Sequence, residues 1–294
     1  MPGLLAGAAG LGLLAAAFWG VGDFAGGMAS KVAGGSLRAT LKVIIVAHLS
    51  SFMLLAGFAV LRHDPLLHGA ALVWALVAGV AAALSVSAFY VALASGEMGV
   101  SAALSGLLAA ALPAVVSGAT DGLPGWRRFA GFVIAGAAIW LIAAGSAARE
   151  QTRTTFLALL SGTGFGCYFV ALRFAGRGGL VWPVATARLT SVATCALLLL
   201  GLKLAQTRPA PGASLEWKRG MLGWVVATCV FDTAGNLFFL AATRAGRLDI
   251  AAVLASLYPA ATIVMAAVVL KERLTGRQTL GMAIALAAVV LITL

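Results

Sequence analysis

AFWGVGDF (residues 17–24) and TGFGCYFV (residues 163–170) are two similar stretches of the chain, and they show how the rest of it is divided. In both, the third residue is aromatic and the fourth is glycine, with Trp19 in the first stretch and Phe165 in the second, 146 positions later. A motif that recurs at a fixed distance indicates a duplicated structural unit. In a long apolar chain, such duplication is typical of membrane transporters.

Other residues recur at nearly the same spacing, which supports the duplication. Pro113 and Pro259 are also 146 positions apart, and near the end of each half the offset becomes 150. At the larger offset, five residues of the first half correspond to identical residues of the second: Arg127, Gly131, Ile134, Leu141 and Ile142 correspond to Arg277, Gly281, Ile284, Leu291 and Ile292. The second copy therefore has about one extra helical turn after its proline. We predict two domains, residues 1–147 and residues 154–294.

The composition places the chain in a membrane. Hydrophobic residues make up 62% of it, charged residues only 10%, and the mean hydropathy is +1.05. A single soluble core could not cover so many apolar side chains, so we predict an all-α membrane protein. With ~20 residues needed to cross the bilayer, ten transmembrane helices are expected: residues 4–28, 39–61, 70–94, 98–119, 127–147, 155–175, 182–203, 219–242, 249–270 and 276–294.

Five helices per copy is an odd number, so the second copy enters the membrane upside down relative to the first. The sequence therefore predicts two inverted five-helix repeats, the plan of alternating-access carriers. The net charge of +11 lies mostly in the loops and indicates contact with anionic membrane lipids, so no nucleic-acid partner is expected. Twelve Lys and Arg residues lie in the loops of one side and seven in those of the other. The positive-inside rule alone would place both termini outside the cytoplasm.

Three charged side chains stand out by their depth inside predicted helices, where a charge is costly and therefore indicates a function. Asp232 lies in the middle of the eighth helix and Arg188 about two turns into the seventh, on the same half of the membrane. We expect these two to form an ion pair. Asp23 lies toward the opposite face, where Lys42 is a candidate partner. Either pair could instead be a buried salt bridge that only holds helices together.

A polar face and several aromatic residues indicate a cavity. Asn236 lies one turn after Asp232 and shares its helix face, which we expect to line that cavity. Aromatic side chains often only pack in a core, but an aromatic cavity with a few polar groups also suits a small organic solute. The aromatic residues that we expect in the cavity are Trp19, Tyr90, Tyr168 and Tyr258.

Two features concern helix movement and helix packing. Pro113 and Pro259 lie inside the predicted fourth and ninth helices, where each removes a backbone hydrogen bond and permits a bend. A hinge at the same place in both copies suits a rocking motion. The predicted fifth and tenth helices are rich in small residues, which is typical of helix-packing surfaces. A homodimer could form through them.

The sequence predicts no enzyme, no metal site and no cofactor. Cys167, Cys195 and Cys229 lie inside predicted helices without metal-ligand spacing. The chain also lacks an HExxH motif, a carboxylate cluster and a Ser-His-Asp set. His48, alone in the second helix, is more simply explained by a hydrogen bond to the backbone or to Ser51 than by a proton path. A membrane-embedded enzyme is the weaker alternative, and a lipid-carrier flippase on the same scaffold stays open.

The chain resembles the EamA-type members of the drug/metabolite transporter superfamily over essentially its whole length. The resemblance rests on the tandem halves, on Trp19-Gly20 and Tyr258-Pro259, and on Lys271-Glu272-Arg273-Leu274, which leads to Gly281 before the last apolar helix. The first half departs from the family pattern. The glutamate expected after its proline-containing helix is missing, and only Asp121 lies nearby.

The resemblance implies secondary transport of a small metabolite, often export of an amino acid or related compound, with helices 1–4 and 6–9 around a central cavity. It also implies that both termini are cytoplasmic, which is the opposite of the charge count. We therefore expect a carrier of the bacterial inner membrane that works by alternating access and is coupled to protons through Asp232. On the same scaffold, an uncoupled facilitator would use Asp232 only to hold Arg188.

Overall fold

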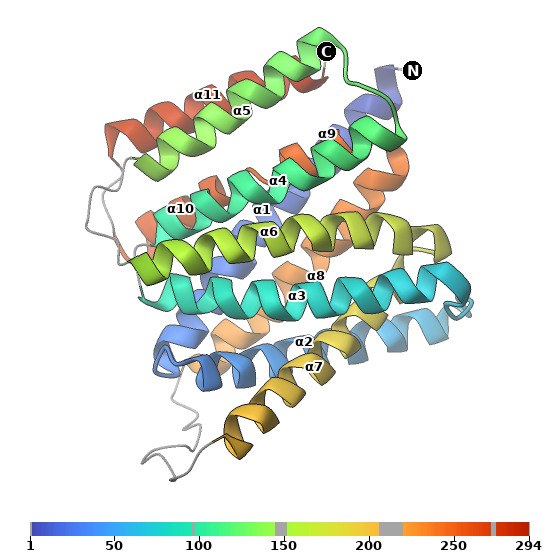
Figure 1. Ribbon diagram of the computed structural model, residues 1–294, viewed down its shortest axis with the longest axis vertical. Helices are drawn as coiled ribbons and strands as arrows, with labels where there is room; N and C mark the ends of the chain where they lie inside the picture. The colour runs from blue at the N-terminus through green and yellow to red at the C-terminus, as the bar shows by residue number, and fades with distance from the viewer. Residues whose placement is uncertain (1, 96–97, 145–151, 206–219, 272–274, 294) are drawn as a thin grey trace.

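Helices account for nearly all of the computed structural model, which describes residues 2–95, 98–144, 152–205, 220–271 and 275–293 (Figure 1). Within these ranges there is no strand. The helices are α1 (Pro2–Val32), α2 (Leu37–Leu61), α3 (Gly69–Ser95), α4 (Met98–Thr120), α5 (Trp126–Ala144), α6 (Thr152–Ala175), the 3-10 turn η1 (Gly176–Gly178), α7 (Val181–Leu204), α8 (Met221–Ala245), α9 (Leu248–Ala255), α10 (Tyr258–Val269) and α11 (Gly276–Thr293). Residues 1, 145–147 and 294 of the predicted domains, and residues 272–274 of the Lys271 motif, lie outside the described residues.

The predicted helix boundaries agree with the observed ones to within a few residues, except in the predicted helix 249–270. This segment forms two helices, α9 and α10, which meet at Ser256 and Leu257. Pro259 explains the break, because proline has no N–H to donate and its ring clashes with the preceding turn. The proline instead occupies the first turn of α10, where an N–H would have no helical partner. Pro113 lies inside the continuous helix α4, so the two predicted hinges differ in this conformation.

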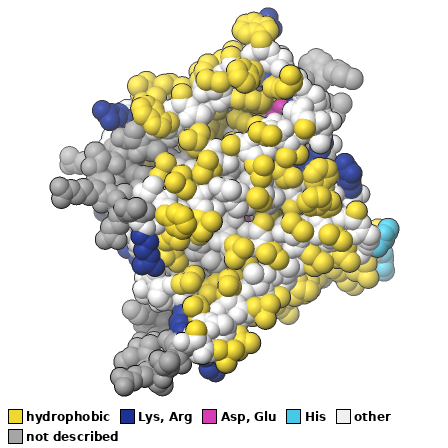
Figure 2. All heavy atoms as spheres, viewed as in Figure 1, with side chains coloured by type: hydrophobic (Ala, Val, Ile, Leu, Met, Phe, Trp, Pro, Cys, Tyr) yellow, Lys and Arg dark blue, Asp and Glu magenta, His cyan; other side chains and the backbone are white. Residues whose placement is uncertain are grey.

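The described helices form an integral membrane protein. Seven helical segments are long and apolar enough to cross a membrane, and Leu104–Thr120 is a shorter apolar one. Apolar side chains cover the middle of the face in Figure 2, while Lys and Arg side chains gather toward its left and right margins. Those margins are where the helices end in Figure 1. An apolar belt with cations at both rims matches a hydrocarbon core between two headgroup layers.

Helices of the first half pack mainly on helices of the second half. The largest interfaces join α1 to α8, α3 to α6, α5 to α11, α4 to α6 and α2 to α7. Helix α4 contacts α6, α9 and α10, and α1 also contacts α9 and α10. Figure 1 shows α5 and α11 side by side at the upper edge of the bundle and α2 with α7 at the lower edge. The core of the molecule therefore lies between the two halves.

Glycines allow the closest helix crossings. A Cβ atom added to Gly20 of α1 would lie 2.6 Å from the carbonyl oxygen of Tyr258 and 2.9 Å from the backbone nitrogen of Thr262 in α10. The same contact is reinforced by Thr262 Oγ1, which donates a hydrogen bond to the Gly20 carbonyl at 3.1 Å. Small residues are common where membrane helices approach this closely, because backbone atoms then make the van der Waals contacts. Gly20 thus places α1 directly against the start of α10.

Gly20→Ala should destabilise the protein, because the new methyl group meets backbone atoms that cannot move aside. We expect a loss of about 1–3 kcal/mol, the usual cost of overpacking, seen as a lower thermal unfolding temperature in detergent. Gly10→Ala on the same helix is the matched control, since no atom lies within 4 Å of its added Cβ. Equal unfolding temperatures for the two variants would contradict this account of the α1–α10 crossing.

Candidate functional site

A small pocket lies in the middle of the bundle between α1, α3, α6, α7, α8 and α10, and we call it the central pocket. Its volume is about 30 Å³, which is room for about two water molecules. Seven of the predicted cavity residues line it: Trp19, Asp23, Tyr168, Arg188, Asp232, Asn236 and Tyr258. Ala82, Val86, Phe165 and Phe169 complete the wall. Helices distant in the sequence therefore bring most of the predicted residues to one place.

Arg188 and Asp232 form an ion pair in the central pocket. Arg188 Nη2 lies 2.6 Å from Asp232 Oδ2, and the two side chains are only 3% and 13% exposed. The guanidinium and the carboxylate are in contact without good hydrogen-bond geometry, and Arg188 Nε has no acceptor among the described residues. Asn236 Nδ2 donates to Asp232 Oδ1 at 3.0 Å. Helices α7 and α8 are thus joined at mid-depth by a charge pair that neither helix could bury alone.

His48 of α2 belongs to the same cluster, although its position in the sequence did not suggest this. Arg188 Nη1 lies 2.8 Å from His48 Nε2, and His48 Nδ1 lies 2.8 Å from Ser191 Oγ. Arginine can only donate, so Nε2 accepts the hydrogen bond and the imidazole proton is on Nδ1, facing Ser191. His48 is therefore neutral in this arrangement. Its Nε2 is 3.6 Å from Asp232 Oδ2, which is too long for a hydrogen bond.

The polar chain continues from Asp232 to α6. Tyr168 donates a short hydrogen bond to Asn236 Oδ1, and Asn236 in turn contacts Asp232. Next to Asp232 on α8, Thr233 shares a hydrogen bond of 2.6 Å with Ser51 of α2. Side chains of four helices, α2, α6, α7 and α8, therefore meet in one buried polar network. Such networks fix the rotation of each helix, because any rotation would leave a buried polar group without a partner.

Asp23 is different from Asp232. It lines the central pocket and is only 8% exposed, yet it forms no hydrogen bond or ion pair with any described side chain. The predicted ion pair with Lys42 is therefore not formed in this structure. Asp23 faces the same pocket as Arg188 and Asp232, so one guanidinium stands opposite two carboxylates.

Aromatic rings form the apolar wall of the pocket. Trp19 stacks on Phe169 with ring centroids 5.0 Å apart and planes 1° from parallel. The indole also contacts α8, where the Phe239 ring lies with its centroid 5.3 Å away and an added Cβ on Gly235 would lie 2.9 Å from Trp19 Nε1. Phe165 packs at a steep angle on Tyr258, with centroids 6.5 Å apart. These contacts hold the rings in place before any ligand arrives.

The tyrosines differ in how they relate to the pocket. The Tyr258 hydroxyl is buried and has no hydrogen-bond partner, although Ser105 lies near it. Tyr90, which we expected in the cavity, does not line it. The end of its ring rests on Gly26 of α1, where a Cβ would leave it no room, and its hydroxyl also lacks a partner. Sequence spacing could not show this, because it depends on a glycine of another helix.

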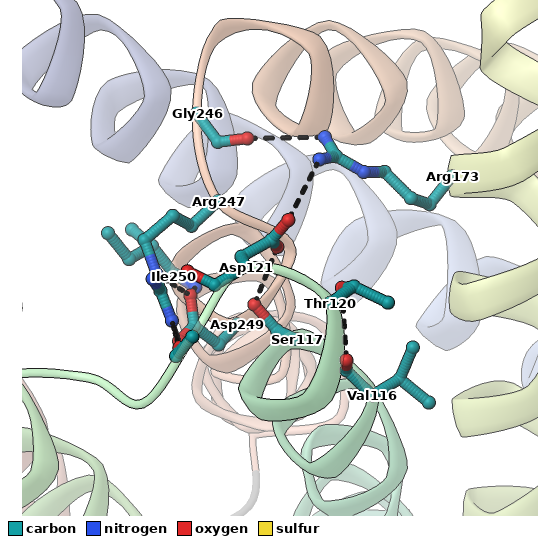
Figure 3. A network of polar contacts seen from close by, with 10 residues as sticks. Val116, Ser117, Thr120, Asp121, Arg173, Gly246, Arg247, Asp249 and Ile250 are labelled. Carbon is teal, nitrogen blue, oxygen red and sulfur yellow. Dashed lines mark hydrogen bonds and ion pairs between the residues drawn. The ribbon is translucent and has the colours of Figure 1, made fainter.

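A second polar cluster joins four elements at one end of the bundle (Figure 3). Asp121, at the end of α4, lies 3.8 Å from Arg173 of α6. Arg247, between α8 and α9, donates to the carbonyl oxygens of Asp121 and Gly122 at 2.8 and 2.6 Å. It also donates to the buried carboxylate of Asp249 at 2.8 Å, and this hydrogen bond is the main reason that the pKa of Arg247 is raised. We call these side chains the helix-end clasp.

The clasp crosses between the halves of the chain. Ser117 Oγ donates to Asp121 Oδ2 at 2.9 Å, and Arg173 Nη1 donates to the carbonyl of Gly246 at 3.2 Å. Figure 3 shows Arg173 of α6 in contact with both Asp121 and Gly246, and Ser117 of α4 in contact with Asp121. Asp121 is the acidic residue that lies near the position where the first half lacks the glutamate of the family pattern. In the structure it holds the end of α4 to the second half.

Comparison with known proteins supports the predicted resemblance. Residues 152–294 match the EamA-like transporter family. A search of curated proteins found no match. Among solved structures 17 chains match, and one crystal structure aligns with a TM-score of 0.70 and 17% identity, over 97% of this chain and 95% of that chain. At this identity the likeness shows a shared fold alone. The family match covers the second half of the chain and agrees with the resemblance to the drug/metabolite transporter superfamily that the sequence predicted.

Arg188→Leu should destabilise the protein strongly, because it leaves the Asp232 carboxylate buried without its charge partner. Breaking such a pair usually costs about 3–5 kcal/mol. The double variant Arg188→Leu with Asp232→Leu should recover much of that loss, since no isolated charge remains. Thermal unfolding in detergent measures both.

The exposed pair Arg62–Asp64 is the matched control. Its atoms are 3.6 Å apart and Arg62 is 60% exposed, so Arg62→Leu should cost less than about 1 kcal/mol. If Arg188→Leu were as mild as this control, or if the double variant were no better than the single one, the ion pair would not organise the pocket.

Proposed function

We propose that this protein is a secondary transporter that moves a small organic solute across the membrane by alternating access. The observation that carries the proposal is the central pocket, which combines charged, polar and aromatic groups at mid-depth between the two halves. The match of the second half to the EamA-like transporter family supports the same conclusion. Solute sites at the interface of duplicated halves are typical of such carriers.

Contacts between helices support the inverted repeat. In an exchange of the two halves, a contact between residues i and j must reappear between i + 146 and j − 146. Three contacts do so. The contact of Trp19 with Gly235 corresponds to the contact of Phe165 with Phe89. The contact of Gly20 with Tyr258 corresponds to that of Gly166 with Leu112. The contact of Phe18 with Phe231 corresponds to that of Gly164 with Ser85. A single rotation that exchanges the two halves must be a rotation of 180° about a two-fold axis. Because each half would have an odd number of helices, the halves would cross the membrane in opposite directions, and this axis would lie in the membrane plane.

The central pocket lies on this proposed axis. Three pairs of its lining residues are related by the offset of 146: Trp19 with Phe165, Asp23 with Phe169, and Val86 with Asp232. Each carboxylate therefore faces an apolar counterpart from the other half. The two halves share the arrangement of their helices, but the carboxylates Asp23 and Asp232 each occur in one half alone. We propose that these charges serve the solute and not the fold alone.

The structure has the properties of a closed state. A pocket of about 30 Å³ does not hold an organic metabolite, so side chains and helices must separate before a solute enters. The helix-end clasp ties α4 to α6, α8 and α9 across the halves at one end of the bundle. We propose that this clasp opens when the pocket becomes accessible from that side and closes when it faces the other side.

The role of Asp232 distinguishes two versions of the carrier. In one version Asp232 exchanges a proton with the solution and couples transport to the proton gradient. In the other, an uncoupled facilitator, Asp232 only holds Arg188. The direct contacts of Asp232 with Arg188 and Asn236 favour the second version, because protonation of the carboxylate would weaken both contacts. The solute we expect is an amino acid or related compound, and the direction we expect is export.

Orientation and assembly are proposed on the same basis. We propose a bacterial inner-membrane protein with cytoplasmic termini, which places the exposed Leu123 in the cytoplasm and Leu204 outside. Labelling of cysteines introduced at these two positions from each side of the membrane tests this, and the reverse pattern would favour the charge count. Helix α5 also presents the exposed Trp126, Phe129 and Trp140, so a homodimer could use this surface.

Transport itself is tested in proteoliposomes with the purified protein, using labelled amino acids, nucleobases and vitamins with and without a pH gradient. We expect saturable uptake of at least one solute. Asp232→Asn should lower the thermal stability of the protein, because Arg188 loses its charge partner. The transport of that solute that remains should keep the pH dependence of the unaltered protein.

Two results would change this conclusion. Loss of gradient-driven accumulation with intact downhill exchange in Asp232→Asn would show that Asp232 carries the coupling proton. Absence of any saturable uptake by correctly folded, reconstituted protein would contradict the transport function.

A further inference from the structure

We infer that the central pocket binds a solute with a positively charged group, and that Asp23 is the residue that pairs with it. This inference rests on the proposed transport function and specifies the chemical class of the solute. The two buried carboxylates, Asp23 and Asp232, then have different roles. Asp232 is neutralised within the protein, whereas Asp23 is neutralised by the solute.

The charge balance of the pocket is the first argument. The charged side chains that line it are Asp23, Asp232 and Arg188. Arg188 lies 2.6 Å from Asp232 and its Nη1 is occupied by His48, which is neutral because it accepts that hydrogen bond. One guanidinium therefore serves two carboxylates and is in contact with only one of them. A pocket with one excess negative charge favours a cation and disfavours an anion.

The position of Asp23 is the second argument. It is only 8% exposed at mid-bundle, where an ionised carboxylate without a partner is strongly disfavoured. Asp232 meets this requirement through Arg188 and Asn236, while no described side chain does the same for Asp23. A cationic group delivered by the solute would supply the missing partner.

The groups around Asp23 suit an organic ammonium group. Trp19 lies one helical turn before Asp23 on the same face of α1, and both line the pocket with Phe165 and Tyr258. Aromatic rings attract cations through their negative faces. The Tyr258 hydroxyl is nine-tenths buried, has no hydrogen-bond partner among the residues that the structure describes, and can accept a hydrogen bond from an N–H group. A carboxylate, aromatic rings and an unpartnered hydroxyl together form a site for an amine.

The size of the pocket limits what this conformation holds. About 30 Å³ is enough for the charged head of an amine but not for a carbon skeleton. The body of the solute must therefore occupy space that opens between α1, α6 and α10 when the halves separate. The charged head would approach Asp23, and the apolar body would lie against the rings of Trp19 and Phe165.

The test uses solutes that share one body and differ only in charge. Phenethylammonium, phenethyl alcohol and phenylacetate form one trio, and propylammonium, propanol and propionate form a smaller one. Binding to the purified protein is measured by thermal stabilisation and by tryptophan fluorescence, and transport is measured in proteoliposomes. In at least one trio we expect the cation to bind about tenfold more tightly than the alcohol, and the anion to bind most weakly.

Variants then locate the charge. Asp23→Asn should lower cation affinity about tenfold and bring it close to that of the alcohol, whereas Asp23→Glu should retain part of the preference. Asp64→Asn is the matched control, because Asp64 is a half-buried carboxylate of the α2–α3 connection that does not line the central pocket, and its change should leave binding unchanged. Thermal unfolding of each variant without solute shows whether it is folded.

The outcomes separate this inference from the proposed function. Equal or tighter binding of the alcohols or the anions, or unchanged cation binding in folded Asp23→Asn, would overturn the inference. Saturable uptake of neutral or anionic solutes, without uptake of either cation, would overturn it and leave the transport function in place. If no solute at all crosses the membrane through the reconstituted protein, the transport function fails as well.

Discussion

The buried ion pair of Arg188 and Asp232 is the interaction on which the arrangement of the central helices depends. A guanidinium that is 3% exposed inside an apolar bundle requires an acceptor within contact distance, and Asp232 lies 2.6 Å away. The remaining hydrogen bonds follow from this pair. His48 must present an acceptor to Arg188, Ser191 must receive the proton of His48, and Asn236 must face Asp232. Helices α2, α7 and α8 are therefore fixed in rotation by the requirements of one charge pair.

Much of the fold could be predicted because it follows from hydrophobic length. Each apolar run long enough to cross a bilayer became a helix, and the depth of Arg188 and Asp232 along their helices placed them close enough to pair. What could not be predicted depends on helix rotation. His48 joined the cluster because α2 packs on α7, and Tyr90 stayed outside the pocket because Gly26 receives its ring. The two prolines also behave differently, since Pro259 starts a helix while Pro113 lies inside one.

The helix contacts recur in the two halves of the chain, whereas the buried charges do not. The contacts that position the helices, such as Gly20 on Tyr258 and Gly166 on Leu112, recur in both halves at one offset. The charges do not recur, since Asp23 corresponds to Phe169 and Asp232 to Val86. A repeated scaffold can rock between two equivalent states because the same contacts form in each. Unrepeated charges within it can recognise a solute without disturbing that equivalence.

Alternating access is the central claim, and distances between spin labels at the two ends of the bundle test it most directly. One pair, at the exposed Leu123 and Arg244, spans the halves beside the helix-end clasp, and the other, at Ser95 and Leu222, spans them at the opposite end. Measured by double electron–electron resonance with and without a transported solute, the two distances should change in opposite directions, one lengthening as the other shortens. Two distances that stay single-valued and unchanged, or that lengthen together, would contradict the account.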